Sequence, residues 1–213
     1  TYNELGNTYI STYNDKYSFG QLDISNPISN NVLTLTYNGT AFPVSNPNNV
    51  SDWNTYFNTN VNAFIPFSSV SVVGTVVNLY GGAGFSLNSI ATGISISDVI
   101  SIVDNGSVIS VAVNGCQGAG VLTSVILPQC TSLGINSFDS CNSLTTIQVP
   151  LVITAGTAAF AGCSSLTNIS LPELISIGDD GMSICTALTT IYLPKCLNLG
   201  STTADNGVFN FIV

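Results

Sequence analysis

Apolar residues in the second half of the chain recur at an interval of 22 residues. Leucine, proline, cysteine and a β-branched residue each keep their own phase of this interval. The phases are Leu122, Leu144, Leu166 and Leu188; Pro128, Pro150, Pro172 and Pro194; Cys141, Cys163 and Cys185; and Val125, Ile147, Ile169 and Ile191. Several phases kept in register predict a solenoid, in which stacked units bury one continuous core.

Each unit contains a stretch with the alternation of a β-strand. In Leu166–Pro172 (LTNISLP) the apolar Ile169 and Leu171 alternate with the polar Asn168 and Ser170. This period of two is typical of a strand that is buried on one face. The proline ends the strand because it cannot donate a hydrogen bond to the sheet.

Six cysteines stand in the chain, three of them in the repeat phase. Equivalent positions of stacked units are expected about 4.8 Å apart, and three such cysteines cannot all pair with one another. Cys130 and Cys196 differ by 66 positions, or three repeats, and are therefore expected roughly 14 Å apart. We predict buried free thiols rather than a disulfide framework. Phe138 and Phe160 mark a further phase, with Met182 in the third unit.

Residues 1–115 lack the 22-residue period, and two stretches there predict hairpins. Asn38-Gly39 separates two alternating segments within Asn31–Val44, which favours a type I′ turn. Asp104–Gly106 separates two segments rich in valine and isoleucine and predicts a second hairpin.

A loop and a short helix are predicted after the first of these hairpins. Ser51 is the expected N-cap, with Trp53 and Phe57 on one helical face. The chain is therefore expected to be mainly β. A β-rich N-terminal anchoring or capping domain at 1–115 is expected to be followed at 116–213 by a solenoid of about four 22-residue repeats with a C-terminal cap.

The repeats resemble the BspA-like (Treponema-type) leucine-rich repeats, whose consensus is C-x-x-L-T-x-I-x-L-P-x-x-x-x-I-G-x-x-A-F. The unit Cys141–Gly162 is similar to this consensus, and the resemblance covers about residues 116–200. Two departures are expected to alter loops only: residues inserted between Cys116 and Leu122, and Asp179–Met182 in place of the aromatic turn. The resemblance implies surface proteins of bacteria, some protists and phages that adhere to host cells or matrix.

Charge narrows the range of functions. Charged residues make up 6% of the chain, with 11 acids against two lysines, a formal net charge of −9 and no histidine. Lys16 and Lys195 cannot form the basic surface that nucleic acids or anionic membranes require. No apolar run is long enough to predict insertion into a membrane. Without histidine the usual catalytic triads and metal centres are missing, so we predict a non-enzymatic protein with no metal and no cofactor.

Carboxylate chemistry is the remaining catalytic alternative. Two carboxylates could serve a glycoside hydrolase, but the acids are scattered and no pair stands out. Asp179-Asp180-Gly181 is expected to be a solvated turn rather than part of a Ca²⁺ site. The glycine-rich stretch YGGAGFSL from Tyr80 is expected to be a loop without phosphate-binding spacing. Glu173 and Lys195 are expected to face each other on neighbouring strands, in a pair worth under about 1 kcal/mol.

The outward residues of the repeat strands form the predicted binding surface. If the β-branched phase points inward, its neighbours point outward. One row then holds Ser124, Thr146, Asn168 and Thr190, and a second holds Ile126, Gln148, Ser170 and Tyr192. We predict binding by Thr146, Gln148, Asn168, Ser170, Thr190 and Tyr192. Such hydroxyl and amide groups suit neutral glycans or another protein; the alternative is a solvated sheet face without a partner.

The sequence closes on apolar residues that we predict to serve assembly, namely Phe209, Phe211, Ile212 and Val213. They could fold over the last repeat, join a neighbouring chain or lead into further sequence. The preferred interpretation is an extracellular recognition or adhesion module: a phage spike, fibre or capsid-decorating protein that binds a host-cell glycan or surface protein. The alternatives are a bacterial cell-surface adhesin and a purely structural virion or filament subunit that associates with itself or with other virion proteins.

Overall fold

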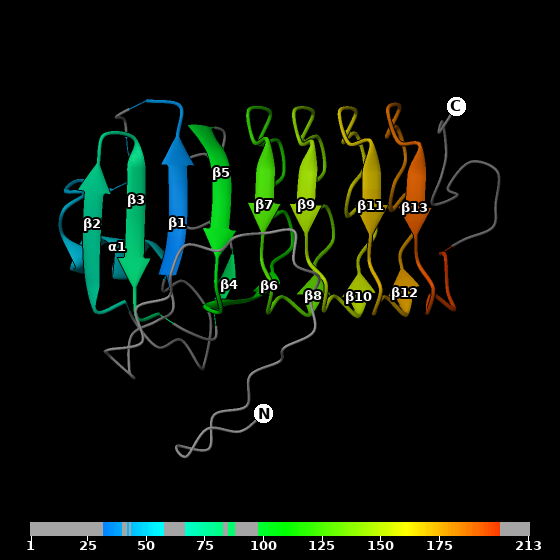
Figure 1. Ribbon diagram of the computed structural model, residues 1–213, viewed down its shortest axis with the longest axis horizontal. Coiled ribbons are helices and arrows are strands. Elements are labelled where there is room, and N and C mark those ends of the chain that lie inside the picture. Colours follow the sequence, from blue (N-terminus) through cyan, green and yellow to red (C-terminus); the bar gives the residue numbers. More distant parts are fainter. Residues whose placement is uncertain are drawn as a thin grey trace, which may run out of the picture.

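The computed structural model describes residues 32–39, 42, 44–57, 67–82, 85–87 and 98–200. Two β-sheets run along its length, with the repeats stacked one behind another (Figure 1). The broader sheet, here called the front sheet, contains β2 (Ser69–Val73), β3 (Val76–Tyr80), β1 (Val32–Tyr37), β5 (Val99–Asp104), β7 (Ser124–Ile126) and β9 (Thr146–Gln148), in that order. It continues with β11 (Asn168–Ser170) and β13 (Thr190–Tyr192), which pair with each other and stand next to β9 in Figure 1.

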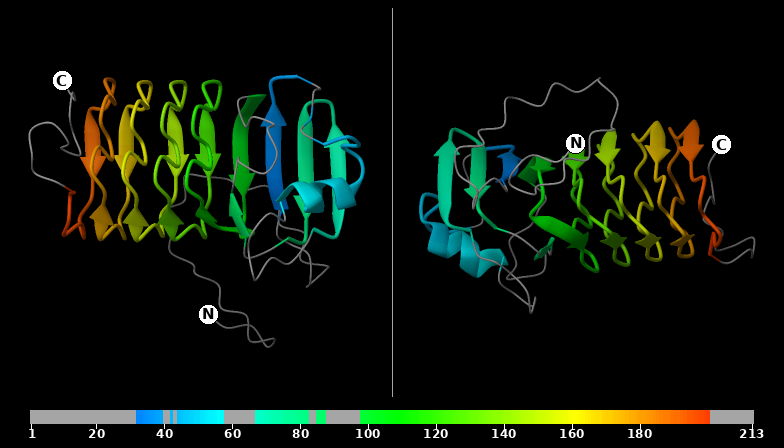
Figure 2. Two further views of the ribbon diagram at one scale, coloured as in Figure 1. Left: turned by 180° about the vertical axis from the view of Figure 1, so that it is seen from behind. Right: turned by 60° about the horizontal axis from the view of Figure 1, so that its bottom comes forward.

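The back sheet lies on the other side of the core and consists of short parallel strands (Figure 2). These are β4 (Phe85–Leu87), β6 (Val108–Val111), β8 (Ser132–Leu133), β10 (Thr154–Ala155) and β12 (Ser176–Ile177). Each 22-residue coil therefore adds one strand to the front sheet and one to the back sheet. The parallel register pairs Val125 with Ile147 and Leu133 with Ala155, so each residue stacks on the one 22 positions later.

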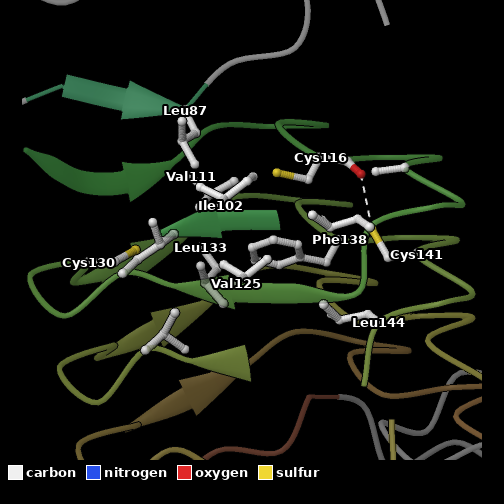
Figure 3. Close-up of a cluster of buried hydrophobic side chains, with 14 of the residues drawn as sticks. Leu87, Ile102, Val111, Cys116, Val125, Cys130, Leu133, Phe138, Cys141 and Leu144 are labelled. Atoms are coloured by element: carbon white, nitrogen blue, oxygen red, sulfur yellow. Dashed lines mark hydrogen bonds between the residues drawn. The ribbon is translucent and has the colours of Figure 1, made fainter. Parts of the chain in front are cut away.

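The repeat phases become columns of buried side chains between the two sheets, as Figure 3 shows for the first coils. The leucine column Leu122, Leu144, Leu166 and Leu188 is buried, as are Phe138, Phe160 and Met182. The Phe138 and Phe160 rings stack with centroids 5.8 Å apart and planes 4° from parallel. The predicted mainly β fold with a solenoid of about four coils is confirmed, because the 22-residue phases pack as a shared core.

The first coil differs from the sequence interpretation, which placed Cys116 at the start of a repeat with inserted residues. The thiol of Cys141 donates to the carbonyl of Cys116 at 3.1 Å (Figure 3). In the same way, the thiol of Cys163 donates to the carbonyl of Phe138 at 3.3 Å. Cys116 therefore occupies the phenylalanine column, and Ala119 occupies the cysteine column. The predicted insertion is wrong, because the coil has its full length once it starts at Ala119.

A glycine column sets how closely consecutive coils approach. A Cβ atom added to Gly134, Gly156 or Gly178 would lie 2.5–2.6 Å from a backbone nitrogen of the preceding coil. Backbone atoms cannot move aside at these positions without separating the coils. Glycine is therefore required here for close backbone approach rather than for a turn.

The third side of each coil is the segment between its back strand and the next front strand. Left-handed backbone conformations recur there in two columns. The first column contains Asn114, Asn136, Ala158 and Asp180, with φ between 53° and 57°; the second contains Gly118, Ser140, Gly162 and Ile184, with φ between 58° and 72°. Glycine and asparagine adopt this region most easily, whereas a β-branched residue is strained in it. Ile184 is therefore the least favourable member of its column.

The predicted hairpin at Asn38-Gly39 is wrong. β1 pairs antiparallel with β3 and β5, and neither partner is the segment that follows Asn38-Gly39. The hairpin that does form joins β2 to β3 through Gly74 and Thr75, with φ of 60° at Gly74. The turn signal at residues 38–39 was local, while the partners of β1 are set by packing against the rest of the sheet.

The predicted hairpin at Asp104–Gly106 is also wrong, because β5 lies in the front sheet and β6 in the back sheet. The buried Asp104 carboxylate accepts hydrogen bonds from the backbone N–H groups of Gly106, Ser107 and Val108 at 2.9–3.1 Å. These bonds satisfy the donors of a corner that turns the chain from one sheet into the other. The corner also joins the two regions without a gap, since β5 pairs with both β1 and β7.

Helix α1 (Val50–Phe57) packs on the core face of the antiparallel strands (Figure 2). The helix was predicted, but with Ser51 as its N-cap. The structure has Asn49 in that role instead, since its side-chain oxygen accepts a hydrogen bond from the backbone N–H of Ser51 at 2.9 Å. Trp53 is buried, with its ring centroid 6.4 Å from that of Tyr37, and its Nε1–H donates to Pro47 O. Helix α1 thus covers the part of the core beyond the back sheet.

Candidate binding face

The outward side chains of β7, β9, β11 and β13 form the surface here called the binding face. Buried Val125 and Ile169 show that the β-branched phase points into the core, which places its neighbours outside. The register pairs Ser124 with Thr146 and Asn168 with Thr190, and β11 stands next to β9 in Figure 1, so the first predicted row extends over all four strands. Ser124 is half-buried, and the other three members are exposed.

The second predicted row is less uniform. Its register pairs Ile126 with Gln148 and Ser170 with Tyr192. Ile126 and Gln148 are half-buried, whereas Ser170 is exposed and Tyr192 is 57% exposed. The accessible part of the binding face therefore lies towards β11 and β13, where a phenol ring stands beside small polar groups.

A third column, formed by Thr123, Thr145, Thr167 and Thr189, was not singled out from the sequence. The Thr145 hydroxyl donates to Thr123 O at 3.1 Å, and the Thr189 hydroxyl donates to Thr167 O at 3.0 Å. These bonds connect consecutive coils at the margin of the binding face. The signal was present in the sequence, since threonine recurs at the 22-residue interval directly before the first row.

The outward rows continue across the antiparallel strands. Ser101 of β5 pairs with Ser124, and Thr34 of β1 pairs with Asn78 of β3. The Thr34 hydroxyl donates to the Asn78 amide oxygen at 2.8 Å. The named positions on all these strands are uncharged, so the front sheet presents hydrogen-bonding groups without a strong local field.

Glu173 and Lys195 pair as predicted, with Lys195 Nζ 2.8 Å and 2.6 Å from the two carboxylate oxygens of Glu173. The pair lies in the turns that follow β11 and β13 rather than on the strands themselves. Both side chains are largely exposed, so the contact is worth less than about 1 kcal/mol. It neutralises the one lysine of this region, which leaves the nearby binding face without a net positive charge.

Burial keeps most of the thiols protonated; Cys185 is the exception, because its hydrogen bond with Cys163 lowers its pKa. The six cysteines are free, and all except the half-buried Cys196 are buried, which confirms the predicted buried thiols. Burial raises the pKa of Cys130 and Cys141 from 9.0 to about 12. The hydrogen bond with Cys185, followed by burial, raises the pKa of Cys163 well above 9.0. A thiol that keeps its proton at neutral pH is a poor nucleophile and a poor metal ligand.

The other predicted features are the acidic turn, the glycine-rich stretch, the absence of a metal site and the apolar C-terminal residues. Asp179 and Asp180 lie half-buried in a turn of the third side, and Asp180 has a left-handed φ of 54°. Of the glycine-rich stretch, Phe85–Leu87 forms β4, so this part is a strand and not a loop. Across the described ranges, no cluster of three or more His, Cys, Asp or Glu side chains could hold a metal ion. Phe209, Phe211, Ile212 and Val213 lie outside the described residues.

Parallel strands, leucine columns and a 22-residue coil define a leucine-rich-repeat solenoid. Comparison with protein families agrees: the profile described as "BspA type Leucine rich repeat region" matches residues 110–210 with six copies. Residues 110–210 are thus similar to the BspA-type leucine-rich repeats. No helix within the described segments has the length and apolar character needed to cross a bilayer.

Two solved structures are similar to parts of the chain. The leucine-rich repeat protein of T. pallidum is 25% identical, over 51% of this chain and 60% of that one, with a TM-score of 0.43. A leucine-rich cell surface protein from Faecalibacterium prausnitzii A2-165 is 20% identical, over 66% of this chain and 41% of that one, with a TM-score of 0.37. The chain thus spans less than two thirds of either protein. A comparison with curated proteins gave no match.

Proposed function

We propose that the chain is a non-enzymatic recognition or adhesion module displayed on a surface, which contacts its target through the binding face. The observation that carries this proposal is the outer surface of the front sheet, whose outward rows are uncharged and which is supported from behind by a packed core. Eight strands at about 4.8 Å give this surface a width of roughly 34 Å. A rigid sheet positions its side chains before binding, which lowers the entropic cost of association.

The chemistry of the binding face suits a neutral host-cell ligand, either a glycan or an uncharged protein surface. The exposed Thr146, Asn168, Ser170 and Thr190 offer hydroxyl and amide groups that both donate and accept hydrogen bonds. Tyr192 adds a ring that can stack on a sugar or anchor a protein contact. A net charge of −9 and only two lysines speak against nucleic acid.

We place the module on the surface of a virion, as part of a phage spike, fibre or capsid decoration; the alternative is an adhesin of a bacterial cell surface. Immunogold labelling of the source culture separates the two. Gold on particles supports the virion, and gold on cell envelopes supports the bacterial adhesin. Labelling confined to the cell interior would contradict both locations.

The experiment that tests recognition is a binding assay with cells and glycans. Gln148→Ala combined with Tyr192→Ala is expected to weaken binding by ten-fold or more, because the pair removes the exposed phenol ring of β13 and the half-buried amide of β9. Thr154→Ala on β10 of the back sheet is the matched control, since this residue is exposed but points away from the binding face. Equal binding by the double variant and the control, with unchanged thermal stability, would remove the binding face from consideration.

A purely structural role is the second candidate, favoured by one observation. Leu197 and Leu199 are exposed on the last described coil, where another subunit could cover them. In that case the chain would associate with copies of itself or with other virion proteins and would show no binding to host cells. Light scattering of the isolated chain, measured beside the cell-binding assay, distinguishes this role from adhesion.

A further inference from the structure

A column of exposed apolar side chains runs along the outside of the back sheet. It holds one residue per coil, beside the start of each back strand, and is here called the back stripe: Ile109, Thr131, Ile153, Ile175 and Leu197. Its four aliphatic members are 40%, 47%, 39% and 86% exposed, in chain order, and Thr131 is exposed as well. Each later member donates its backbone N–H to the carbonyl of the member before it, so the stripe is one continuous ladder.

The two sheets differ in what they present to solvent. The exposed positions of the binding face hold mostly threonine, asparagine and serine, whereas the back stripe holds isoleucine or leucine in four of its five coils. A single exposed leucine needs no explanation, but a contiguous apolar patch on a soluble face marks an interaction site. The back stripe therefore has the character of a surface that a partner covers.

A second copy of the chain matches the back stripe in spacing. A two-fold axis through Ile153 lays one stripe antiparallel on the other, with Ile109 opposite Leu197, Thr131 opposite Ile175, and Ile153 beside its own copy. Both stripes repeat at about 4.8 Å, so the side chains stay in step over all five coils. An unrelated partner would need the same period to make equivalent contacts along the whole stripe.

Charge does not oppose this pairing, although the chain carries a formal net charge of −9. The column two residues before the stripe contains Gln129, Leu151, Glu173 and Lys195. Its two charged members already pair with each other, and Asp179 and Asp180 lie beyond the back strands on the third side. The same axis places the exposed Leu151 next to its own copy and Gln129 opposite Glu173. The result is an apolar centre with a polar rim, as in known interfaces.

The area suffices for a weak dimer. Five coils at about 4.8 Å give a length of about 24 Å, and the residues on either side of the stripe give a width of up to about 20 Å. The face therefore measures about 500 Å² on each copy, or about 1,000 Å² over the pair, which is the lower limit for a specific interface. We expect a dissociation constant in the micromolar range.

We infer that two copies of the chain pair back to back through the back stripe. The front and back sheets lie on opposite sides of the core, so both binding faces stay on the outside of the pair (Figure 2). The pairing itself does not depend on what the binding face recognises. A pair that holds two such faces attaches to a surface of repeated ligands more tightly than a single chain does.

The test is light scattering coupled to size exclusion, with the 213-residue chain at about 1 μM to about 100 μM. The chain is expected to change from monomer to dimer over this range. Ile153→Asp is expected to raise the dissociation constant by about 30-fold or more, because it buries a carboxylate against its own copy. Ile109→Asp, at the end of the stripe, is expected to raise it by about ten-fold. Val73→Asp is the matched control, since Val73 is 71% exposed on β2 and lies outside the stripe.

Folding is checked separately. At about 1 μM, where the chain is monomeric, circular dichroism is expected to give Ile153→Asp and the unchanged chain the same melting temperature, because the side chain is then in water. Ile153→Ser, which adds no charge, is expected to weaken the dimer in the same direction by a smaller factor.

Four results would overturn the inference. The chain could stay monomeric at about 100 μM, or Val73→Asp could weaken the dimer as much as Ile153→Asp. A dimer lost with Leu199→Asp but kept with Ile109→Asp would form through the last described coil instead. A monomer that binds phosphatidylcholine vesicles, and loses this binding with Ile153→Asp, would assign the stripe to a lipid surface.

Discussion

The coils and the antiparallel strands solve the same packing problem in different ways. In the coils, front strands of three residues suffice, because each residue contacts its equivalents 22 positions away and every column repeats. β1 is twice as long, and its partners β3 and β5 share no sequence relation with it. Stability in the coils is thus spread over many similar nearest-neighbour contacts, whereas the antiparallel part depends on contacts that occur once.

The sharpest way to break the coils is to prevent their close approach. Gly156→Ala places a Cβ 2.6 Å from Ile135 N and 2.8 Å from Gly134 C. Since both are backbone atoms, the coils must separate, and the free energy of unfolding is expected to fall by about 3 kcal/mol or more. Urea denaturation followed by circular dichroism measures this loss. Gly39→Ala, where a Cβ meets nothing within 4 Å, is the control. A loss equal to that of the control would mean that coil spacing is not fixed by glycine.

The corner at Asp104 is where the two regions meet, and its removal tests how strongly they are coupled. Asp104→Asn replaces one carboxylate oxygen by an amide donor that faces backbone N–H groups. Unfolding free energy is expected to fall by about 2 kcal/mol, because buried donors lose their acceptor. Asp98→Asn, at an exposed position, is the control. Two separate denaturation transitions in Asp104→Asn would show that the corner holds the regions in one cooperative unit.

The buried thiols predict that stability falls at high pH. Burial raises the pKa of Cys130 from 9.0 to about 12, so the folded state keeps a proton that the unfolded state loses above pH 9. The contribution is fully present below pH 9 and is lost as the pH rises towards 12, by up to about 1.4 kcal/mol per pH unit. Cys130→Val, which copies Val152 of the same column, is expected to reduce this slope between pH 9 and pH 10.5. Cys196→Val, at a half-buried position, is the control; equal slopes in both variants would contradict the assignment.

The smallest expected effect is a gain. Ile184 has a φ of 58° and is half exposed, and glycines stand in its column at residues 118 and 162. Ile184→Gly relieves the strain of a β-branched residue in the left-handed region, less the entropy cost of glycine. The unfolding free energy is expected to rise by about 0.5–1 kcal/mol in the same urea assay. Ile175→Gly, on an exposed residue outside the left-handed columns, is expected to lower it instead.

The same contrast explains what could be predicted from the sequence. In the coils, a residue's partner is its equivalent one period later, so phase alone placed Phe138 on Phe160 and Glu173 beside Lys195. Phase failed only at Cys116, where an incomplete first repeat made the nearest cysteine a misleading start. Five of the six predicted binding residues are exposed, as expected from strand alternation.

The antiparallel part offered only local signals. Asn38-Gly39 and Asp104–Gly106 do mark places where the chain leaves a strand, but a turn motif does not specify which strand comes next. That choice depends on burial across the whole sheet, as the three N–H groups bound by Asp104 illustrate. The partial burial of Gln148 could not be predicted from the sequence either, because it depends on neighbouring side chains rather than on strand alternation.

The glycine column fixes the spacing between coils, so the length of the solenoid is a whole number of identical steps. Because every coil meets the next through the same close backbone contact, adding or removing one unit of 22 residues changes the solenoid by a single step of about 4.8 Å and leaves every other step intact. Duplication or loss of one unit in a gene would therefore lengthen or shorten the protein without redesigning its interior. The number of coils, each spaced by its glycine, therefore sets the length of the solenoid.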